Sequence, residues 1–191
     1  MPIQLKSPVI ETERLILRPW KQEDREHYFT LSSDEDVMEY FPNAQMREEA
    51  DAVFARIFAR QEEVGQCFPV IEEKNTGAFL GFCGLSVPRG DLGLPVWPTV
   101  EIGWRLHKAH WGKGITLEAA KAWLEFAFHE LKLEEVIAYT AHNNMKSRRV
   151  MEKLGMSRNP AEDFRITSLD RDHRLNPHVL YRLSAEVWRE D

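Results

Sequence analysis

The sequence predicts an α/β domain built on a mixed sheet. Strand-like segments occur near both ends of the chain, at residues 13–18 and 178–184, with helix-like segments between them. Two apolar runs rich in β-branched and aromatic residues, 67–72 and 78–87, are joined by the polar segment 73–77, which predicts a β-hairpin. The sheet should therefore be partly antiparallel, although periodicity alone does not fix the order of its strands.

The helices are predicted from the spacing of apolar residues. Residues 47–64 carry apolar side chains three and four positions apart up to Gly65, a residue type common at helix C-termini. Residues 111–131 show the same spacing over a longer stretch, and residues 146–154 precede a second capping glycine, Gly155. A polar, acidic helix is predicted at residues 21–36, and further strands are predicted at residues 99–106 and 136–141.

Length and composition favour one globular domain. The chain has 191 residues, 43% of them hydrophobic, so we expect a single domain over residues 1–191. The formal net charge of −6 disfavours a general nucleic-acid-binding protein, because neutralising phosphates requires clustered Lys and Arg. No apolar run reaches the roughly 20 residues of a membrane span, and residues 1–8 lack the apolar stretch of a secretory signal. We expect a cytoplasmic protein with no membrane partner.

Cysteines and histidines give no indication of a metal site. Cys67 and Cys83 both lie in apolar, strand-like runs without the paired spacing of zinc ligands, so two buried thiols are expected. The seven histidines show no His-Glu-x-x-His or Cys/His spacing. We therefore expect no bound metal.

A glycine-containing segment precedes the predicted long helix. It consists of Trp111, Gly112, Lys113, Gly114, Ile115 and Thr116. The first turn of a helix has unpaired N–H groups and the positive end of the helix dipole, and glycine lets an anion approach the backbone. The spacing fits neither a P-loop nor a Rossmann fingerprint. The segment predicts a phosphate-binding loop of another kind, the alternative being a turn that needs glycine only for its geometry.

The surrounding residues carry a family resemblance. Residues 100–120, VEIGWRLHKAHWGKGITLEAA, resemble the core motif of the GNAT superfamily of N-acetyltransferases, especially the branch of the ribosomal-protein enzymes RimJ and RimL. The family pattern [QR]-x-x-G-x-[GA] falls on residues 111–116. Trp111 replaces Gln or Arg, as in many RimJ/RimL-like sequences, whereas Thr116 replaces Gly or Ala. The branched Thr116 puts the cofactor affinity in question, although its hydroxyl could donate to a phosphate oxygen.

A second motif lies downstream. Residues 142–156, HNNMKSRRVMEKLGM, resemble the family segment N-x-x-S-x-R-V-x-x-K-x-G-[FM]. Its positions are occupied by Asn144, Ser147, Arg149, Val150, Lys153 and Gly155. The opening ETERLILRPW and the closing HVLYRL also resemble this branch, so the resemblance covers nearly the whole chain and is weakest at residues 162–176.

The resemblance implies a fold and a cosubstrate. The GNAT-type (acyl-CoA N-acyltransferase) fold is an α/β fold whose mixed central sheet, flanked by helices, contains two parallel strands that splay apart. Acetyl-CoA would place its pantetheine arm along residues 100–106, as an added strand would lie, with residues 136–141 as the partner strand. The residues implied to bind the cofactor are Trp104, Leu106, Trp111, Gly112, Lys113, Gly114, Ile115, Thr116 and Asn144. For Asn144 the alternative is an ordinary helix cap.

The implied reaction is direct attack of a primary amine on the thioester through a tetrahedral intermediate. Ser147 matches a serine proposed in RimL-like enzymes to donate to the leaving sulfur; its alternative is a helix cap. Glu101 is the candidate base, since the family often places a Glu there and alternation puts it opposite Val100 and Ile102. Its alternatives are a solvated charge on the strand face and an ion pair with Arg105.

Other residues and functions are less well specified. His107 and His110 are candidates for phosphate contacts, and Trp97 and Trp104 for the lining of the acceptor site, against exposed-turn and packing roles. The acceptor amine, a protein N-terminus or a small molecule, is not legible in the sequence. The alternative function is an acyl-CoA-binding sensor or interaction protein with little turnover. The sequence leaves open whether the chain forms a homodimer.

Overall fold

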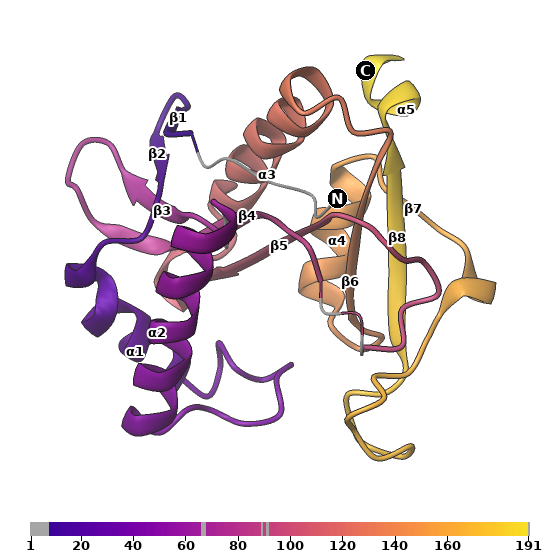
Figure 1. Cartoon of the computed structure of the whole chain (residues 1–191), viewed down its shortest axis with the longest axis horizontal. Coiled ribbons are helices and arrows are strands. Elements are labelled where there is room, and N and C mark those ends of the chain that lie inside the picture. Colours follow the sequence, from indigo (N-terminus) through magenta and orange to yellow (C-terminus); the bar gives the residue numbers. More distant parts are fainter. Residues whose placement is uncertain (1–7, 66–67, 89, 91, 191) are drawn as a thin grey trace.

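The computed structural model describes residues 8–65, 68–88, 90 and 92–190, which together form one eight-stranded sheet (Figure 1). The strand order is β1-β2-β3-β4-β5-β6-β8-β7. The strands are β1 (Ile10–Glu11), β2 (Leu15–Arg18), β3 (Val70–Glu73), β4 (Phe79–Ser86), β5 (Glu101–Leu106), β6 (Glu135–Ala141), β7 (Ser157–Arg158) and β8 (His178–Ser184). Neighbouring strands are antiparallel except β5 and β6, which are parallel.

Helices cover both faces of this sheet. The α-helices are α1 (Arg25–Ser33), α2 (Arg47–Val64), α3 (Ile115–Glu125), α4 (Met145–Lys153) and α5 (Ala185–Glu190). Short 3₁₀ helices occur at η1 (Gln22–Asp24), η2 (Lys108–His110) and η4 (Pro160–Glu162), and α3 continues into a π-helical turn, η3 (Phe126–Glu130). In Figure 1, α2 lies in front of the sheet and α4 behind β6.

The two faces are buried by different clusters. On one face α3 and α4 pack on the sheet through the main core, in which Trp123 is fully buried. On the other face α1 and α2 cover β3 and β4 around the indole of Trp20. Beyond β5 on this second face, Ile137 and Leu180 of β6 and β8 are covered by described residues of a third cluster, which come mainly from loops.

The parallel strands β5 and β6 pair at one point and then separate. Their only register pair among the described residues is Glu101 with Ile137, next to a hydrogen bond of 3.0 Å from the Ile137 N–H to the Val100 carbonyl. From there to Leu106 no strand in the described part of the chain pairs with the edge of β5 that faces β6, and Figure 1 shows the two strands diverging. The predicted GNAT-type mixed sheet with a splayed parallel pair is confirmed.

Several element boundaries differ from the sequence prediction. The helix predicted at residues 21–36 is shorter, because Asp34 adopts an extended conformation and its carboxylate accepts the N–H groups of Asp36 and Val37. The long helix begins at Ile115 rather than at Trp111, since residues 111–114 form the loop itself. The strands β1 and β7 and the helix α5 were not predicted, because two-residue strands and a terminal turn leave little periodicity. The helix over 47–64 is confirmed, with Gly65 in the left-handed conformation at φ 81°.

Two expectations concern single features of the chain. Cys83 is a free, fully buried thiol, as predicted, and burial raises its pKa. Cys67 lies outside the described residues. In the part of the chain that the structure describes, no helix has the length and apolar character needed to cross a membrane.

Candidate active site

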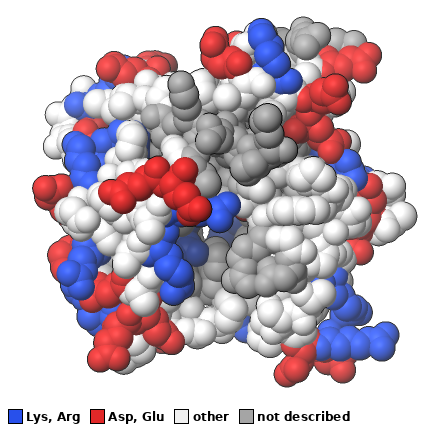
Figure 2. Space-filling view, in the orientation of Figure 1, with Lys and Arg blue, Asp and Glu red and all other residues white. Residues whose placement is uncertain are grey.

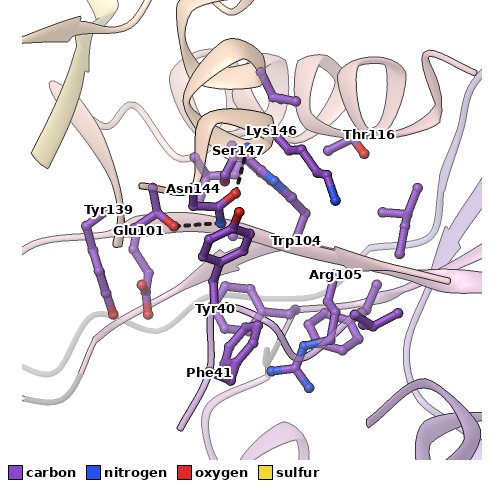
Figure 3. Close-up of a pocket in the computed structure, with 18 of the residues that line it drawn as sticks. Tyr40, Phe41, Glu101, Trp104, Arg105, Thr116, Tyr139, Asn144, Lys146 and Ser147 are labelled. Atoms are coloured by element: carbon purple, nitrogen blue, oxygen red, sulfur yellow. Dashed lines mark hydrogen bonds between the residues drawn. The ribbon is translucent and has the colours of Figure 1, made fainter. Parts of the chain in front are cut away.

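A cleft of about 830 Å³ opens where β5 and β6 separate. It is lined by β5, by the ends of β6 and α4, by residues 36–42, and by residues 166–178. In Figure 2, which shows the face carrying α1 and α2, a hollow near the centre contains basic side chains. Figure 3 shows the predicted catalytic residues Glu101 and Ser147 in this cleft with Trp104, Thr116 and Asn144. Residues nearly fifty positions apart in the sequence are thus brought together.

The open edge of β5 presents its backbone groups in a defined pattern. The N–H of His107 donates to Leu80 on the β4 side, whereas the carbonyl of Val100 accepts from β6. Because backbone groups of successive strand residues point in opposite directions, the N–H and C=O groups of Trp104 and Leu106 face the opening. These are the two β5 residues predicted to bind the cofactor. The N–H groups of both and the Trp104 carbonyl are available to an added strand, whereas the Leu106 carbonyl already accepts from the indole of Trp111.

Trp111 fastens the glycine loop to the end of β5. Its indole N–H donates to the Leu106 carbonyl at 2.9 Å, and the ammonium of Lys146 lies 4.2 Å from the centroid of its ring. The indole therefore bridges β5 and α4 across the cleft. This placement explains how a Trp can stand where the family pattern has Gln or Arg: it anchors the loop through a hydrogen bond to the strand that the cofactor would follow.

Both loop glycines have positive φ. Gly112 has φ 73° and Gly114, at the N-terminus of α3, has φ 78°. No atom lies within 4 Å of the position that a Cβ would take at Gly112, and at Gly114 the nearest is an Arg14 nitrogen at 3.5 Å. The glycines are thus required by backbone conformation and also leave open space above the first turn of α3, as an approaching phosphate would need.

Hydrogen bonds from Thr12 and Arg14 link the segment before β2 to the glycine loop and to the first turn of α3. Glu118, in the first turn of α3, accepts hydrogen bonds from the Thr12 hydroxyl at 2.5 Å and the Arg14 Nε at 2.6 Å. Arg14 also donates to the carbonyl of Lys113 at 3.1 Å. Interaction with Arg14 and Thr12 outweighs partial burial, which acts in the opposite direction, and lowers the pKa of Glu118. The N-terminal segment before β2 therefore fixes the loop conformation.

The remaining loop residues have different environments. The side chain of Thr116 lines the cleft, where its hydroxyl is accessible to a ligand. Ile115 is 6% exposed and packs in the main core, so only its backbone can face the cleft. Lys113 is exposed and does not line the cleft, and neither does Gly114. A cofactor contact by Gly114 or Ile115 would therefore involve their backbone groups, and a contact by Lys113 its backbone or its exposed ammonium group.

Asn144 caps α4, and Ser147 is left free to face the cleft. The Asn144 side-chain oxygen accepts from the Ser147 N–H at 3.1 Å, and its amide donates to the Thr140 hydroxyl at 2.9 Å (Figure 3). The cap considered for Asn144 is therefore present. The cap considered for Ser147 is not, because Ser147 contributes its backbone N–H, whereas its side chain lies in the lining of the cleft.

Glu101 lies at the point from which β5 and β6 diverge. Glu101 is partly buried in the wall of the cleft, and this burial raises the pKa of its carboxylate to about 7, while a hydrogen bond with the Tyr139 hydroxyl and the charge of Arg60 act in the opposite direction. Burial, reinforced by this carboxylate, raises the pKa of Tyr139. Of the two alternatives for Glu101, the ion pair with Arg105 is not found among the described residues.

The cleft also contains residues that the sequence did not single out. Tyr139 is one, and the others shown in Figure 3 are Tyr40, Phe41, Arg105 and Lys146. Arg105 follows Glu101 by four residues on β5 and therefore points to the same face of the strand. Tyr139 could have been found only from the register of β5 with β6, which sequence periodicity does not provide.

Residues 34–42 form one wall of the cleft and are attached to distant parts of the chain. The ammonium of Lys108 lies 3.3 Å from Asp34 and 3.1 Å from Asp36. Arg174 donates to the carbonyls of Glu39 and Phe41. These contacts place Phe41 against Arg105, and the guanidinium carbon of Arg105 lies 4.0 Å from the centroid of the Phe41 ring.

Of the less specific candidates, His107, His110 and Trp97 do not line the cleft. His107 and His110 form the turn between β5 and the loop, and burial together with the charge of Lys113 lowers the pKa of His110. Trp97 is 53% exposed and lies outside the cleft, whereas Trp104 lines it. Within the described residues there is no cluster of three or more His, Cys, Asp or Glu side chains able to hold a metal ion.

Comparison with known proteins identifies the family to which this site belongs. A family model described as an acetyltransferase (GNAT) domain matches residues 14–157. The chain belongs to the GNAT acetyltransferase family. The match contains the loop, the open edge of β5 and α4, and this GNAT chain is therefore an acyltransferase whose family uses acetyl-CoA as the acyl donor.

Two of the relatives of this GNAT acetyltransferase described below cover nearly its full length, and a third covers about three quarters of it. The uncharacterized N-acetyltransferase YnaD of Bacillus subtilis is 30% identical over 179 residues, 94% of this chain and 98% of its own. The solved structure of a GNAT-family acetyltransferase from Bacillus anthracis is 27% identical, with a TM-score of 0.76 over 94% of this chain and 99% of that one. The FsC-acetyl coenzyme A-N(2)-transacetylase of Aspergillus fumigatus is 29% identical over 78% of this chain and 65% of its own.

Proposed function

We propose that this protein transfers the acetyl group of acetyl-CoA to a primary amine by direct attack of the amine on the thioester. The observation that carries the proposal is the position of Glu101: a buried carboxylate with a raised pKa stands where the open edge of β5 begins, and that edge leads to the glycine loop. The alternative of a binding protein without turnover offers no reason for a carboxylate with a pKa near neutrality at this point.

The cosubstrate would be held by backbone along most of its length. The N–H and C=O groups of Trp104 and the N–H of Leu106 suit the amides of a pantetheine arm lying between β5 and β6. The N–H groups at the start of α3, with the Thr116 hydroxyl, suit the diphosphate. Lys146, Arg149 and Lys153 line the same side of the cleft from α4 and supply positive charge toward the phosphates.

Glu101 and Ser147, which line the cleft where β5 and β6 separate, would each carry out one of the proton transfers. Glu101 would take a proton from the acceptor ammonium, because a base with a pKa near 7 is half ionised at neutral pH and matches the operating pH of a general base. The amine would then attack the thioester carbonyl, forming the N–C bond and a tetrahedral oxyanion. This intermediate collapses with cleavage of the C–S bond, and the second proton lost by the nitrogen replaces the one that Ser147 gives to the sulfur. A backbone N–H of β5 would donate to the oxyanion, and the Ser147 hydroxyl would donate to the departing sulfur.

The nature of the amine is proposed only as a class. A protein N-terminus fits the resemblance to the RimJ/RimL branch, whereas the name of the Aspergillus relative describes transfer to a nitrogen of FsC. We expect the reaction to occur in the cytoplasm.

Thiol release measured across a panel of small amines and N-terminal peptides tests the proposal. Wild-type protein should release CoA from acetyl-CoA much faster with a suitable amine than without one, and mass spectrometry should find one acetyl group on that amine. Glu101→Gln should lose most of this acceleration. Glu130→Gln, which removes a carboxylate charge at an exposed position, is its matched control. Binding of acetyl-CoA with no acceleration by any amine would support a sensor instead.

A further inference from the structure

Arg105 presents a buried positive charge with unused hydrogen-bond donors at the cleft. Its Nε and Nη1 atoms are inaccessible to water and have no hydrogen-bond partner among the described residues. The guanidinium lies 4.0 Å from the ring centroid of Phe41 and 5.3 Å from that of Phe82, and it interacts with the Tyr28 hydroxyl. Aromatic faces attract the charge but do not satisfy N–H donors, so beyond the Tyr28 hydroxyl the described residues around the guanidinium supply no acceptor for Nε and Nη1.

A second buried arginine in the same chain shows what such a site normally contains. Arg18 is 8% exposed and donates to both carboxylate oxygens of Asp24, at 2.8 and 2.9 Å, and to Glu72 at 2.6 Å. For Arg105 the described part of the chain supplies no carboxylate. Burial accordingly lowers the pKa of Arg105, whereas the two carboxylates raise the pKa of Arg18 against its own burial. A guanidinium stays charged in proteins, so the missing partner is an anion.

The position of Arg105 connects this charge with the acceptor side of the cleft. Arg105 and Glu101 project from the same face of β5, roughly 13 Å apart along the strand. Arg105 also borders a second cavity of about 400 Å³, between α2 and residues 38–45, to which Arg56 contributes a further positive charge and Glu49 a negative one. The basic residues of the cofactor side, by contrast, lie on α4.

The carboxylates near this end are already engaged. Asp36 is paired with Lys108, and Glu49 accepts the N–H of Met46 at the start of α2. Glu101 is occupied with Tyr139. Among the described lining residues Arg105 is therefore the cation whose partner is still to be supplied at the acceptor end.

We propose that the acceptor of this enzyme is an amine that also carries a carboxylate, and that Arg105 binds this carboxylate while Glu101 receives the amine. The inference rests on the proposed function, since it assigns the second end of the same substrate. A carboxylate suits the planar guanidinium because it can accept two parallel N–H bonds. The separation of Glu101 and Arg105 requires an extended acceptor with several bonds between its amine and its carboxylate.

Matched pairs of small amines test the inference. The pairs are ω-aminobutanoate with butylamine, ω-aminohexanoate with hexylamine and ω-aminooctanoate with octylamine, compared by kcat/KM in the thiol-release assay. Wild-type protein should prefer the carboxylate at one chain length by at least tenfold, a ratio typical of a desolvated charged hydrogen bond. Arg105→Met should remove this preference, because kcat/KM for the preferred amino acid falls to that of its alkylamine partner in the same variant. Arg171→Met, which removes an exposed arginine, should leave the preference intact.

A binding measurement separates failure of the inference from failure of the proposed function. Hexanoate and hexylammonium are titrated calorimetrically into the protein saturated with CoA. Binding of hexanoate that Arg105→Met abolishes would support the anion site even if no amine were acetylated. Arg105→Lys, which retains charge but loses the fork of donors, should weaken hexanoate binding and serves if the Met variant does not fold. No carboxylate preference at any length, or a preference that persists in Arg105→Met, would overturn the inference.

Discussion

Replacing Glu101 by Gln should change stability in a pH-dependent way. Burial raises the pKa of Glu101 from an ordinary value of 4.5 to about 7. Between these two values the folded protein keeps a proton that the unfolded chain releases, so the free energy of unfolding of the wild type falls as pH rises through this window. The gap between the two pKa values corresponds to about 3 kcal/mol. Gln is neutral at every pH and is free of this loss.

Urea unfolding of the protein without cofactor, near pH 4.5 and pH 8, measures the effect. Relative to the wild type, Glu101→Gln should gain about 3 kcal/mol between the two pH values. Glu130→Gln, at an exposed position, should run parallel to the wild type. A constant difference between the Glu101→Gln and wild-type curves would mean that the carboxylate is not desolvated in the folded protein. Glu101 would then lack the raised pKa that suits a general base at neutral pH.

The same variant should be impaired in catalysis while gaining stability. We expect kcat/KM for the amine to fall by about 10²-fold, within the range for loss of a general base, and to recover in part at high pH, where free amine becomes available. The affinity for acetyl-CoA should be nearly unchanged. Wild-type rates across the pH range would leave Glu101 a structural residue and an ordered water as the preferred route for the proton.

Three further substitutions separate roles within the site. Ser147→Ala should lower kcat by at least about tenfold with unchanged melting temperature, because Ala retains the N–H that Asn144 caps; a normal kcat would remove Ser147 from the chemistry. Asn144→Ala loses that cap and should destabilise the protein by about 1 kcal/mol in urea unfolding, whereas an unchanged midpoint would contradict the capping role. Tyr139→Phe removes the donor that favours ionised Glu101, so the pKa of Glu101 should rise and the ascending limb of the kcat/KM profile should move to higher pH; a shift to lower pH would refute the assignment.

The sequence predicted the parts of the site that lie in continuous segments. The glycine loop, the β5 residues Trp104 and Leu106, and Asn144 with Ser147 each belong to a short motif whose local conformation is set by its own residues. The structure brings them to one cleft because the loop joins β5 to α3 and the α4 segment follows β6 directly. Segments that are connected in the chain therefore meet in space, and for this reason local sequence motifs were sufficient to predict the fold.

What the sequence missed depends on pairings between distant segments. Tyr139 reads as an ordinary strand residue, and its contact with Glu101 follows from the parallel register of Glu101 with Ile137. Arg105 was considered only as a partner for Glu101; its actual neighbours, Phe41 and Phe82, come from a loop and another strand. The overlong helix at residues 21–36 has a similar origin, because the Asp34 turn was not distinguished from a polar helix end and Phe41 was therefore not expected at the cleft.

Calorimetric titration of acetyl-CoA is the most direct test of the proposed diphosphate site at the start of α3. The titration compares the wild type with Gly114→Val and Gly77→Val. Gly77, in the turn between β3 and β4, has φ 70° and Gly114 has φ 78°, so both valines introduce similar backbone strain, but only position 114 adjoins the proposed diphosphate site. We expect the wild type and Gly77→Val to bind acetyl-CoA with similar affinity. Gly114→Val should bind it at least tenfold more weakly, a loss of about 1.4 kcal/mol of binding free energy. A folded Gly114→Val variant with wild-type affinity would contradict the account and place the diphosphate away from the start of α3.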